Sequence, residues 1–474
     1  MQASLVLDRI LSAVRGGEWG RWSSVPPYLV RHTIHHAVEA DRVDELLVDV
    51  EFLIHADIAS LRPELRRATT SAARLNAEVY ERACEASLHG GQYSDLADWR
   101  WVLAVEAARH GEPNLAERFV ADTGTEGWVP RWADTVSLDE GWATAVACGV
   151  VNDWHFIAVA GSTGAVWIRD AASGGPIGAP LTGHRGHVSA ISTADLAGRQ
   201  VVVTGGADST VRVSDAISGD LVTAFEAGCG WVNAIACVRL HGRTVAVVCG
   251  DESVRLWDLA SKEPIGGPQD AHRWARAVAC VDPDDHPVVV TGSNDHGVRI
   301  WDPDGGMLLH PPMRGHRDRV YAASCGVLNG RHVVVTGGDD DAVHVSDIAA
   351  GREVYQPLMG HTSWVSAVVC TVVDGRPVAF SGGPDRTVRM WDLTTATCRA
   401  ILVMPVEVHA LSISSDGGLV VCSGSDVLVF DQLAGENGEA DGRWARARLV
   451  HTTATAPGGG RGVTDAKWHF GPRE

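Results

Sequence analysis

The sequence predicts an all-β seven-bladed β-propeller preceded by a small all-α helical domain. Three observations lead to this fold class: a long internal repeat, a change of hydrophobic period near residue 128, and paired apolar segments within each repeat. Each repeat runs from an apolar strand through a Gly-rich turn to a second strand that closes on Asp. The closing residues, spaced by 45, 43, 44, 45, 45 and 39 positions, are Asp170, Asp215, Asp258, Asp302, Asp347, Asp392 and Asp431. This period is typical of propeller blades, which are small sheets that bury their faces only against neighbouring sheets.

Residues 1–127 have the spacing of helices, and we assign them to a helical linker or docking domain. Pro26 and Pro27 open the segment PPYLVRHTIHHAVEA, and proline is well placed in the first turn of a helix. A later helical stretch ends at Gly111, which is a candidate C-terminal cap. The short polar joints between the helical stretches predict an antiparallel array.

Charge and composition exclude several classes of function. The chain has 59 acidic and 40 basic residues and a net charge of -19, which opposes binding to nucleic acid or to an anionic membrane. No apolar run is long enough to span a membrane, and Asp8 interrupts the first apolar stretch, so we expect no secretory signal. We therefore expect a cytoplasmic protein.

Metal and redox chemistry are not predicted. The ten cysteines include no CxxC pair, and five of them recur at one position per repeat, as expected for small buried side chains in a reducing compartment. His32, His35 and His36 form an HxxHH pattern without a third ligand nearby in the sequence, so we interpret them as packed or solvated. The sequence thus predicts neither a metal nor another cofactor.

From Trp128 the pattern changes to alternating strands, and the ends of the repeats resemble the WD40 family. Gly-His pairs and closing Trp-Asp pairs carry the resemblance: Gly183-His184, Gly315-His316, Gly360-His361, Trp257-Asp258, Trp301-Asp302 and Trp391-Asp392. The resemblance implies a WD40 propeller over residues 128–435. A partly flexible extension, Gly/Thr-rich at its start, is expected over residues 436–474.

The resemblance also implies a hydrogen-bond network within a blade. In this family a His before the first strand, a hydroxyl on the second, an Asp in the next turn and a Trp on the third are joined, which satisfies buried polar groups. Two repeats match all four positions, with His272, Thr291, Asp295, Trp301 and His361, Ser381, Asp385, Trp391. Two further repeats have Ser at the Trp position but keep His184, Thr204, Asp208 and His316, Thr336, Asp340. The trio also describes a hydrolase triad, but its recurrence around the ring favours a structural role.

Closure of the ring needs a fourth strand for the last blade, because an open ring leaves unpaired sheet edges. We favour RWADTVSL, residues 131–138, because Val136 precedes Trp142 by the same distance that separates apolar residues from the next strand in internal repeats. The competing candidate is RWARARLV, residues 443–450.

One position at the start of each first strand is a candidate for partner binding. The seven residues, expected to surround one mouth of the channel, are Trp142, His187, Trp231, Trp274, Arg319, Trp364 and Glu407. Trp and Arg commonly anchor interfaces. A second ring, whose mainly polar chemistry suits selectivity, contains Thr144, Ser189, Asn233, Arg276, Tyr321, Ser366 and His409. We take the first ring, with Arg276 and Tyr321, as the partner-binding face. Alternatively, each Trp packs flat against the next blade.

The helical region has a resemblance of its own. The strings SVPPYLVRHTIHHA, VDELLVDVEFLIHAD and LADWRWVLAVEAARHG resemble the segment that joins the nucleotide-binding and WD40 parts of bacterial STAND-type (NACHT-like) signalling NTPases. In that family the propeller senses a ligand and the NTPase relays the signal. The chain has no GxxxxGK[ST] motif, and GGGRG at 458–462 lacks the Lys. The resemblance therefore implies a sensor and linker without the NTPase.

The first functional hypothesis is a non-enzymatic scaffold or sensor that binds a protein or peptide partner on one propeller face and has no catalytic residues. Its helices would dock a second partner or a nucleotide-switch module. One alternative is the sensor half of a STAND-type NTPase, acting with a separate NTPase or no longer functional. Another is an enzyme with a site at the channel mouth. The identity of the partner and the oligomeric state stay open.

Overall fold

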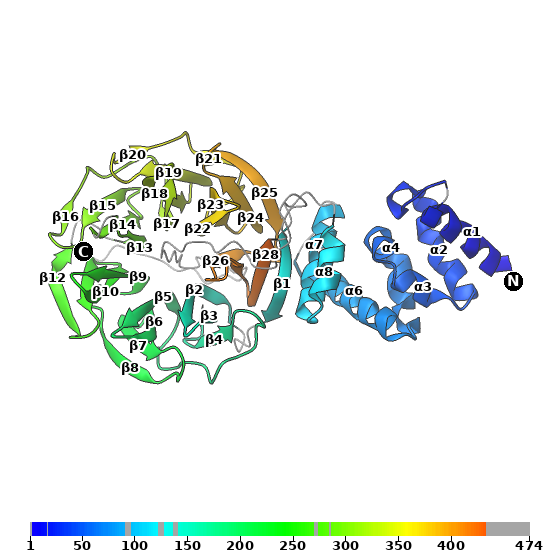
Figure 1. Ribbon diagram of the computed structural model, residues 1–474, viewed down its shortest axis with the longest axis horizontal. Helices are drawn as coiled ribbons and strands as arrows, with labels where there is room; N and C mark the ends of the chain where they lie inside the picture. The colour runs from blue at the N-terminus through cyan, green and yellow to red at the C-terminus, as the bar shows by residue number, and fades with distance from the viewer. Residues whose placement is uncertain are drawn as a thin grey trace, which may run out of the picture.

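A ring of seven sheets follows a helical domain in this computed structural model (Figure 1). The structure describes residues 2–16, 18–90, 96–121, 128–135, 141–269, 274–283 and 286–432. The fold class expected from the sequence, a seven-bladed propeller preceded by a helical domain, is confirmed. No helix among these residues is long and apolar enough to cross a membrane.

The described part of the helical domain contains helical segments of three to twenty residues. They are α1 (Gln2–Gly16), η1 (Trp22–Ser24), α2 (Pro27–Glu39), α3 (Val43–Leu47), α4 (Val50–His55), α5 (Ile58–Leu61), η2 (Arg62–Arg67), α6 (Ser71–Gly90), α7 (Leu96–Arg109) and α8 (Pro113–Val120). Pro27 opens α2, where its fixed φ suits a first helical turn. Asp49 caps α4 by accepting a 3.1 Å hydrogen bond from the Phe52 N–H, and it also accepts from the Trp22 indole at 2.9 Å.

The blades follow one another around the ring, and each has its first strand innermost (Figure 1). Blade one contains β2 (Ala143–Val151), β3 (Trp154–Gly161) and β4 (Val166–Asp170), and blade two contains β5 (Val188–Leu196), β6 (Arg199–Gly206), β7 (Thr210–Asp215) and β8 (Leu221–Glu226). Blade three contains β9 (Val232–Leu240), β10 (Arg243–Gly250), β11 (Val254–Asp258) and β12 (Glu263–Gln269). Blade four contains β13 (Ala275–Val281), β14 (Val288–Ser293), β15 (Val298–Asp302) and β16 (Met307–Leu308).

The last three blades complete the ring. Blade five contains β17 (Val320–Leu328), β18 (Arg331–Gly338), β19 (Ala342–Asp347), β20 (Arg352–Glu353) and β21 (Leu358–Met359). Blade six contains β22 (Ala367–Val373), β23 (Arg376–Gly382), β24 (Thr387–Asp392) and β25 (Thr397–Val403). Blade seven contains β26 (Val408–Ile413), β27 (Leu419–Ser423), β28 (Asp426–Gln432) and β1 (Trp128–Thr135).

The strand from before blade one closes blade seven. β1 pairs antiparallel with β28, so the two ends of the propeller meet within one sheet. The expected closing segment, 131–138, overlaps β1 at residues 131–135, and its last three residues lie outside the described part of the chain. The competing segment, 443–450, also lies outside it.

The helices join the propeller at this closing blade. The Trp101 ring on α7 meets Phe430 of β28 edge to face at 5.8 Å, and Arg109 donates to Asp426 at 2.8 Å. One continuous core of buried apolar side chains runs from the helices into blades six and seven. The helical domain is therefore packed against the ring through aromatic, apolar and ionic contacts.

A recurring irregularity positions the start of each first strand. In six blades the pairing of the first and second strands skips one residue, between positions 143 and 145, 188 and 190, 232 and 234, 275 and 277, 320 and 322, and 408 and 410. Such a bulge bends the strand and redirects the neighbouring side chains. The residues just before these bulges are those expected at the channel mouth.

Candidate functional site

Three tryptophans of the mouth are exposed to solvent. Trp231 is 55% exposed, Trp142 42% and Trp274 40%, and each directly precedes the first strand of its blade. Arg319 and Glu407 are also exposed at the same position, whereas His187 and Trp364 are half-buried. The structure thus places the expected ring at the starts of the inner strands, with Trp364 contributing less surface than the other three indoles.

Trp274 has an unusual backbone. Its φ of 58° lies in the left-handed region, which bulky side chains rarely adopt. Its N–H donates to the Asp251 carbonyl at 2.9 Å, and its own carbonyl accepts from the Asn294 N–H at 3.2 Å. These two bonds to neighbouring turns hold the strained conformation, which keeps the indole at the rim instead of letting it fold into a groove.

A chain of polar contacts extends from Trp274 across the mouth. The Arg276 guanidinium lies 5.8 Å from the centre of the Trp274 ring, within cation–π range, and donates to the Asn233 side-chain oxygen at 2.9 Å. The Asn233 amide in turn donates to Asp251 at 2.9 Å. Burial lowers the pKa of Arg276, and its Nε is buried without a hydrogen-bond partner. The site thus holds a partly desolvated cation beside an exposed aromatic ring.

Blade five continues this polar surface. The Tyr321 hydroxyl donates to Asp339 at 3.3 Å and accepts from Arg319 at 3.5 Å. Burial raises the pKa of the Tyr321 phenol, so it stays protonated and able to donate near neutral pH. Arg276, Arg319 and Tyr321 therefore give the mouth over blades four and five both cationic and hydroxyl groups.

Most of the second ring has a different role from the one expected. Thr144, Ser189, Asn233 and Ser366 are buried. Each donates to a backbone carbonyl at the first strand of the next blade, those of Val188, Val232, Ala275 and Val408 respectively. These side chains staple adjacent blades together and are not accessible to a partner. Only Arg276, Tyr321 and His409 of this ring are left for selectivity, and burial lowers the pKa of His409 to about 4.

The repeated His–hydroxyl–Asp groups form internal networks. In blade six, His361 Nδ1 lies 2.8 Å from Asp385, and its Nε2 lies 2.7 Å from Ser381, which also accepts from the Trp391 indole at 2.7 Å. In blade two, His184 contacts Asp208 at 3.1 Å and Thr204 at 2.9 Å.

In blade four, one of the four residues predicted to form the network, His272, lies outside the described residues. There the Trp301 indole donates to Thr291 at 3.3 Å, and Arg299 donates to Asp295 at 3.1 Å. The His side chains of blades two and six are almost fully buried. Such groups fold a polar turn onto the sheet and have no open face for a substrate.

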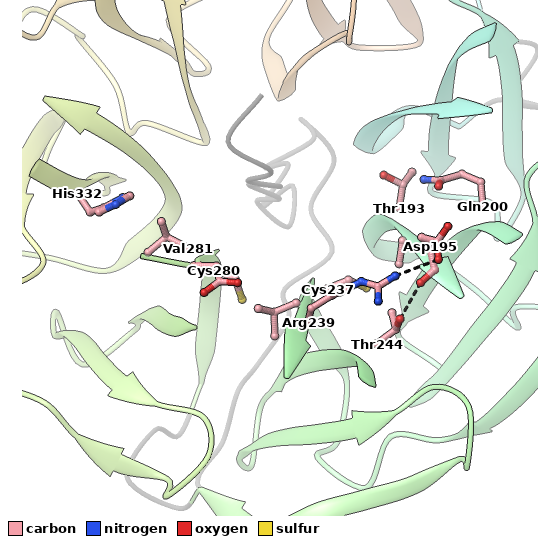
Figure 2. Close-up of a pocket in the computed structure, with 12 residues that line it drawn as sticks. Thr193, Asp195, Gln200, Cys237, Arg239, Thr244, Cys280, Val281 and His332 are labelled. Carbon is pink, nitrogen blue, oxygen red and sulfur yellow. Dashed lines mark hydrogen bonds and ion pairs between the residues drawn. The ribbon is translucent and has the colours of Figure 1, made fainter. Parts of the chain in front are cut away.

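A cavity lies at the other ends of the first strands, away from the tryptophans. It has a volume of about 500 Å³ and lies among the ends of β5, β9 and β13, with residues such as Thr193, Cys237, Cys280 and His332 in its lining (Figure 2). Arg239 pairs with Asp195 across its wall at 3.2 Å, and Thr244 donates to the Asp195 carbonyl at 2.7 Å. Cys237 and Cys280 occupy the recurring cysteine position, and burial raises the pKa of Cys237 to about 11, which favours the protonated thiol near neutral pH.

The sequence analysis did not predict one cluster of possible metal-ligating residues. His316, Asp340 and His344 of blade five place a ligand atom each within 4.8 Å of one another, and within the described ranges this is the one group of three or more such residues. The available signal was a break in the repeat: position 344 is occupied by Arg212, Arg255, Arg299 and Arg389 in four other blades. His32 and His35, considered as ligands earlier, have ring centres 5.7 Å apart on α2.

Comparison with known proteins agrees with the repeat and the ring. The family "WD domain, G-beta repeat" matches residues 175–215, 269–302 and 352–392. Kinesin-like protein KIF21A of Homo sapiens is 28% identical over 149 residues, covering 30% of this chain and 9% of that protein. The ribosome biogenesis protein WDR12 homolog of Chlamydomonas reinhardtii is 30% identical over 150 residues, covering 29% of this chain and 32% of that protein. The chain thus spans less than a third of the length of these relatives.

A solved structure covers the propeller. The WD40 β-propeller domain of Doa1 superimposes with a TM-score of 0.52 at 19% identity, over 67% of this chain and 99% of that domain. Identity at this level shows the fold alone. Together with the family match and the seven sheets described above, it establishes that this chain carries WD40 repeats folded as a seven-bladed β-propeller.

Proposed function

We propose that this protein is a non-enzymatic interaction scaffold or sensor that binds a protein or peptide partner at the tryptophan-bearing mouth of its propeller. The observation that carries the proposal is the exposure of Trp142, Trp231 and Trp274 on one rim. By contrast, Trp301 and Trp391, which lie on third strands, are buried. Large indole rings in water are favourable anchors because a partner gains much apolar area when it covers them.

The polar groups beside these rings indicate the chemistry of the partner. Arg276 lies within cation–π distance of the Trp274 ring, and Arg319 donates a hydrogen bond to Tyr321. An apolar side chain with a carboxylate one or two residues away would satisfy both kinds of group. WD40 propellers generally bind protein partners, and this chain's fold is of that type.

The packed junction supports a role for the helices in relaying or anchoring. Arg109 of α7 pairs with Asp426, and Trp101 packs on Phe430, so the helical domain contacts the blade that closes the ring. A partner bound to the helices would thus be held in a defined orientation to the mouth. This arrangement also suits the alternative in which the chain serves as the sensor and linker of a STAND-type system with a separate NTPase.

The cysteines bear on location. All ten are free, and Cys398 is exposed, which suits a reducing compartment and supports our placement of the protein in the cytoplasm.

A capture experiment with two matched variants tests the mouth. The test variant is W142A/W231A/W274A, which removes the exposed indoles and keeps the half-buried Trp364. The control is I217A/M307A/M359A, which removes exposed apolar side chains that are 57%, 69% and 64% exposed and lie away from the starts of the first strands. Both must melt like the unmodified protein.

The readout is quantitative mass spectrometry of proteins captured from lysate, followed by calorimetry with the purified candidate. We expect a partner that binds the control and the unmodified chain alike, with affinity for the test variant reduced by at least about 30-fold, the effect of about 2 kcal/mol at one anchor. Equal affinity for both variants would refute recognition at the mouth and move it to the helices or the outer rim.

A further inference from the structure

Blade five holds a buried group of metal-ligand atoms that has no counterpart among the described residues of the other blades. His316 lies in the turn before β17, Asp340 in the turn between β18 and β19, and His344 on β19. The side chains of all three are less than a tenth exposed. Their ligand atoms lie within 4.8 Å of one another. Two turns and one strand of blade five therefore bring these three side chains together.

Comparison with other blades shows that blade five differs at the position of His344. Blades two and six keep the same His–Asp pair but have Arg212 and Arg389 where blade five has His344. In blade two an added Cβ on Gly183 would lie 2.3 Å from the Arg212 guanidinium, so that glycine makes room for an arginine. In blade five a guanidinium has been replaced by an imidazole, which can bind a metal ion.

A carboxylate accompanies this replacement. An added Cβ on Gly315 would lie 1.8 Å from Glu353 Oε1 and 3.2 Å from His344 Nδ1. The glycine that faces Arg212 in blade two therefore faces a Glu353–His344 pair here. The pair is joined by a 2.7 Å hydrogen bond between His344 Nδ1 and Glu353.

Each prospective ligand residue also makes a further hydrogen bond within the blade. His316 Nε2 bonds Thr336 at 2.8 Å, and the Arg317 N–H donates to Asp340 at 2.9 Å. Together with the Glu353 contact, these orient the two rings so that His316 Nδ1 and His344 Nε2 both face Asp340. Orientation of ligating histidines through the other ring nitrogen is the usual construction of protein metal sites. His344 Nε2 is buried, makes no hydrogen bond of good geometry, and lies 3.4 Å from Asp340.

The two distances to Asp340 are close to those expected around one ion. Bonds of about 2.0–2.1 Å in a tetrahedral site place neighbouring ligand atoms about 3.3 Å apart. His316 Nδ1 lies 3.0 Å and His344 Nε2 lies 3.4 Å from the same Asp340 oxygen. A cavity of about 390 Å³, lined by Arg317, Asp340, His344 and Met359 among others, adjoins the cluster and leaves room for a fourth ligand.

We propose that blade five binds one divalent transition-metal ion, with zinc favoured, through His316 Nδ1, Asp340 and His344 Nε2. Two imidazoles and one carboxylate favour zinc and its neighbours over Mg²⁺ or Ca²⁺, which prefer oxygen ligands. The ion would connect three parts of blade five: the turn before β17, the turn between β18 and β19, and β19 itself. Its role follows from these positions and is structural or regulatory.

The test measures zinc binding by the full-length chain after removal of metals with a chelator. The main variant, H344R, restores the residue found in blades two and six and so preserves the blade while removing a ligand. E353Q keeps all three ligands and removes only the carboxylate behind His344. H241Q is the control, because His241 is 70% exposed and lies outside the cluster.

We expect calorimetry with ZnCl₂ to give one more site per chain for the unmodified protein and H241Q than for H344R. E353Q should bind about 10–100-fold more weakly than the unmodified chain. Cobalt loading should give the visible spectrum of a tetrahedral site with nitrogen and oxygen ligands. Equal zinc stoichiometry in H344R, absence of binding in the unmodified chain, or thiolate-to-cobalt bands would each overturn the proposal. Should H344R fail to fold, an unchanged affinity in E353Q would overturn it as well.

Discussion

Removal of the Arg131 guanidinium should weaken the closure of the ring. Arg131 lies on β1 and donates to Asp431 at 2.8 Å, to Asp416 at 2.7 Å and to the Ala171 carbonyl of blade one at 3.0 Å. A single side chain thus connects the closing strand to the last blade and to the first. The substitution R131M keeps the aliphatic stem and deletes the cation, so its effect reports the polar contacts alone.

The expected magnitude follows from burial. The side chains of Arg131 and Asp431 are 14% and 16% exposed, and Asp416 is 27% exposed. Breaking a buried pair by removal of one partner costs about 3–5 kcal/mol, since a carboxylate remains buried without its counter-charge. Because water reaches these groups in part, we expect a loss of about 3 kcal/mol. For a unit of this size, that corresponds to a melting temperature about 5 °C lower.

Thermal melting and hydrogen exchange form the assay. R199M is the matched control, because Arg199 also pairs with the Asp that closes a repeat, Asp215, but is 59% exposed and should contribute about 0–1 kcal/mol. R131M should also raise exchange at β1 and β28. The double variant R131M/D431N should recover part of the loss, because the orphaned carboxylate is gone. A melting temperature for R131M equal to that of R199M, or no recovery in the double variant, would refute the reasoning.

Three further outcomes are expected. Because burial lowers the pKa of His409 from 6.5 to about 4, the unfolded state binds the extra proton in this window. The free energy of unfolding, measured with urea, should therefore be highest above pH 6.5 and about 2 kcal/mol lower at pH 5. The decrease should be smaller in H409N. S381A should cost about 3 kcal/mol in the same assay, since it orphans two buried nitrogens, including that of His361. R109M should lower stability by about 2 kcal/mol and raise hydrogen exchange in α7 and β28, where Arg109 meets Asp426, but not in blades two to five.

The features that recur in each blade were within reach of the sequence. An Asp that closes every repeat, such as Asp215, marks the end of a third strand, and position 187 or 231 marks the start of a first strand, because one backbone geometry is used seven times. Seven imperfect copies average out the ambiguity that a single short apolar run would carry. The His361 network was expected from the resemblance to the WD40 family, whose pattern the repeat positions match, and the structure contains it.

Features that occur once could not be read in this way. Arg109 and Asp426 are 317 positions apart and meet only because the closing strand brings the helices to blade seven. Trp231 is 55% exposed and Trp364 is half-buried although both occupy the same position of the repeat, so spacing does not predict their exposure. The burial of Thr144 and its partners in the second ring depends on the distance between adjacent blades, which spacing within one repeat does not encode.

The two proposed sites share one part of blade five, and this gives them a physical connection. Asp339, which accepts from Tyr321 at the mouth, is followed directly by Asp340 of the ion cluster. The turn before β17 likewise contains His316 at one end and Arg319 at the other. An ion that fixes His316 and Asp340 would therefore also fix the residues that present the cationic side of the mouth. Binding equilibria coupled in this way are reciprocal, so a partner that binds more tightly in the presence of zinc must tighten zinc binding by the same factor.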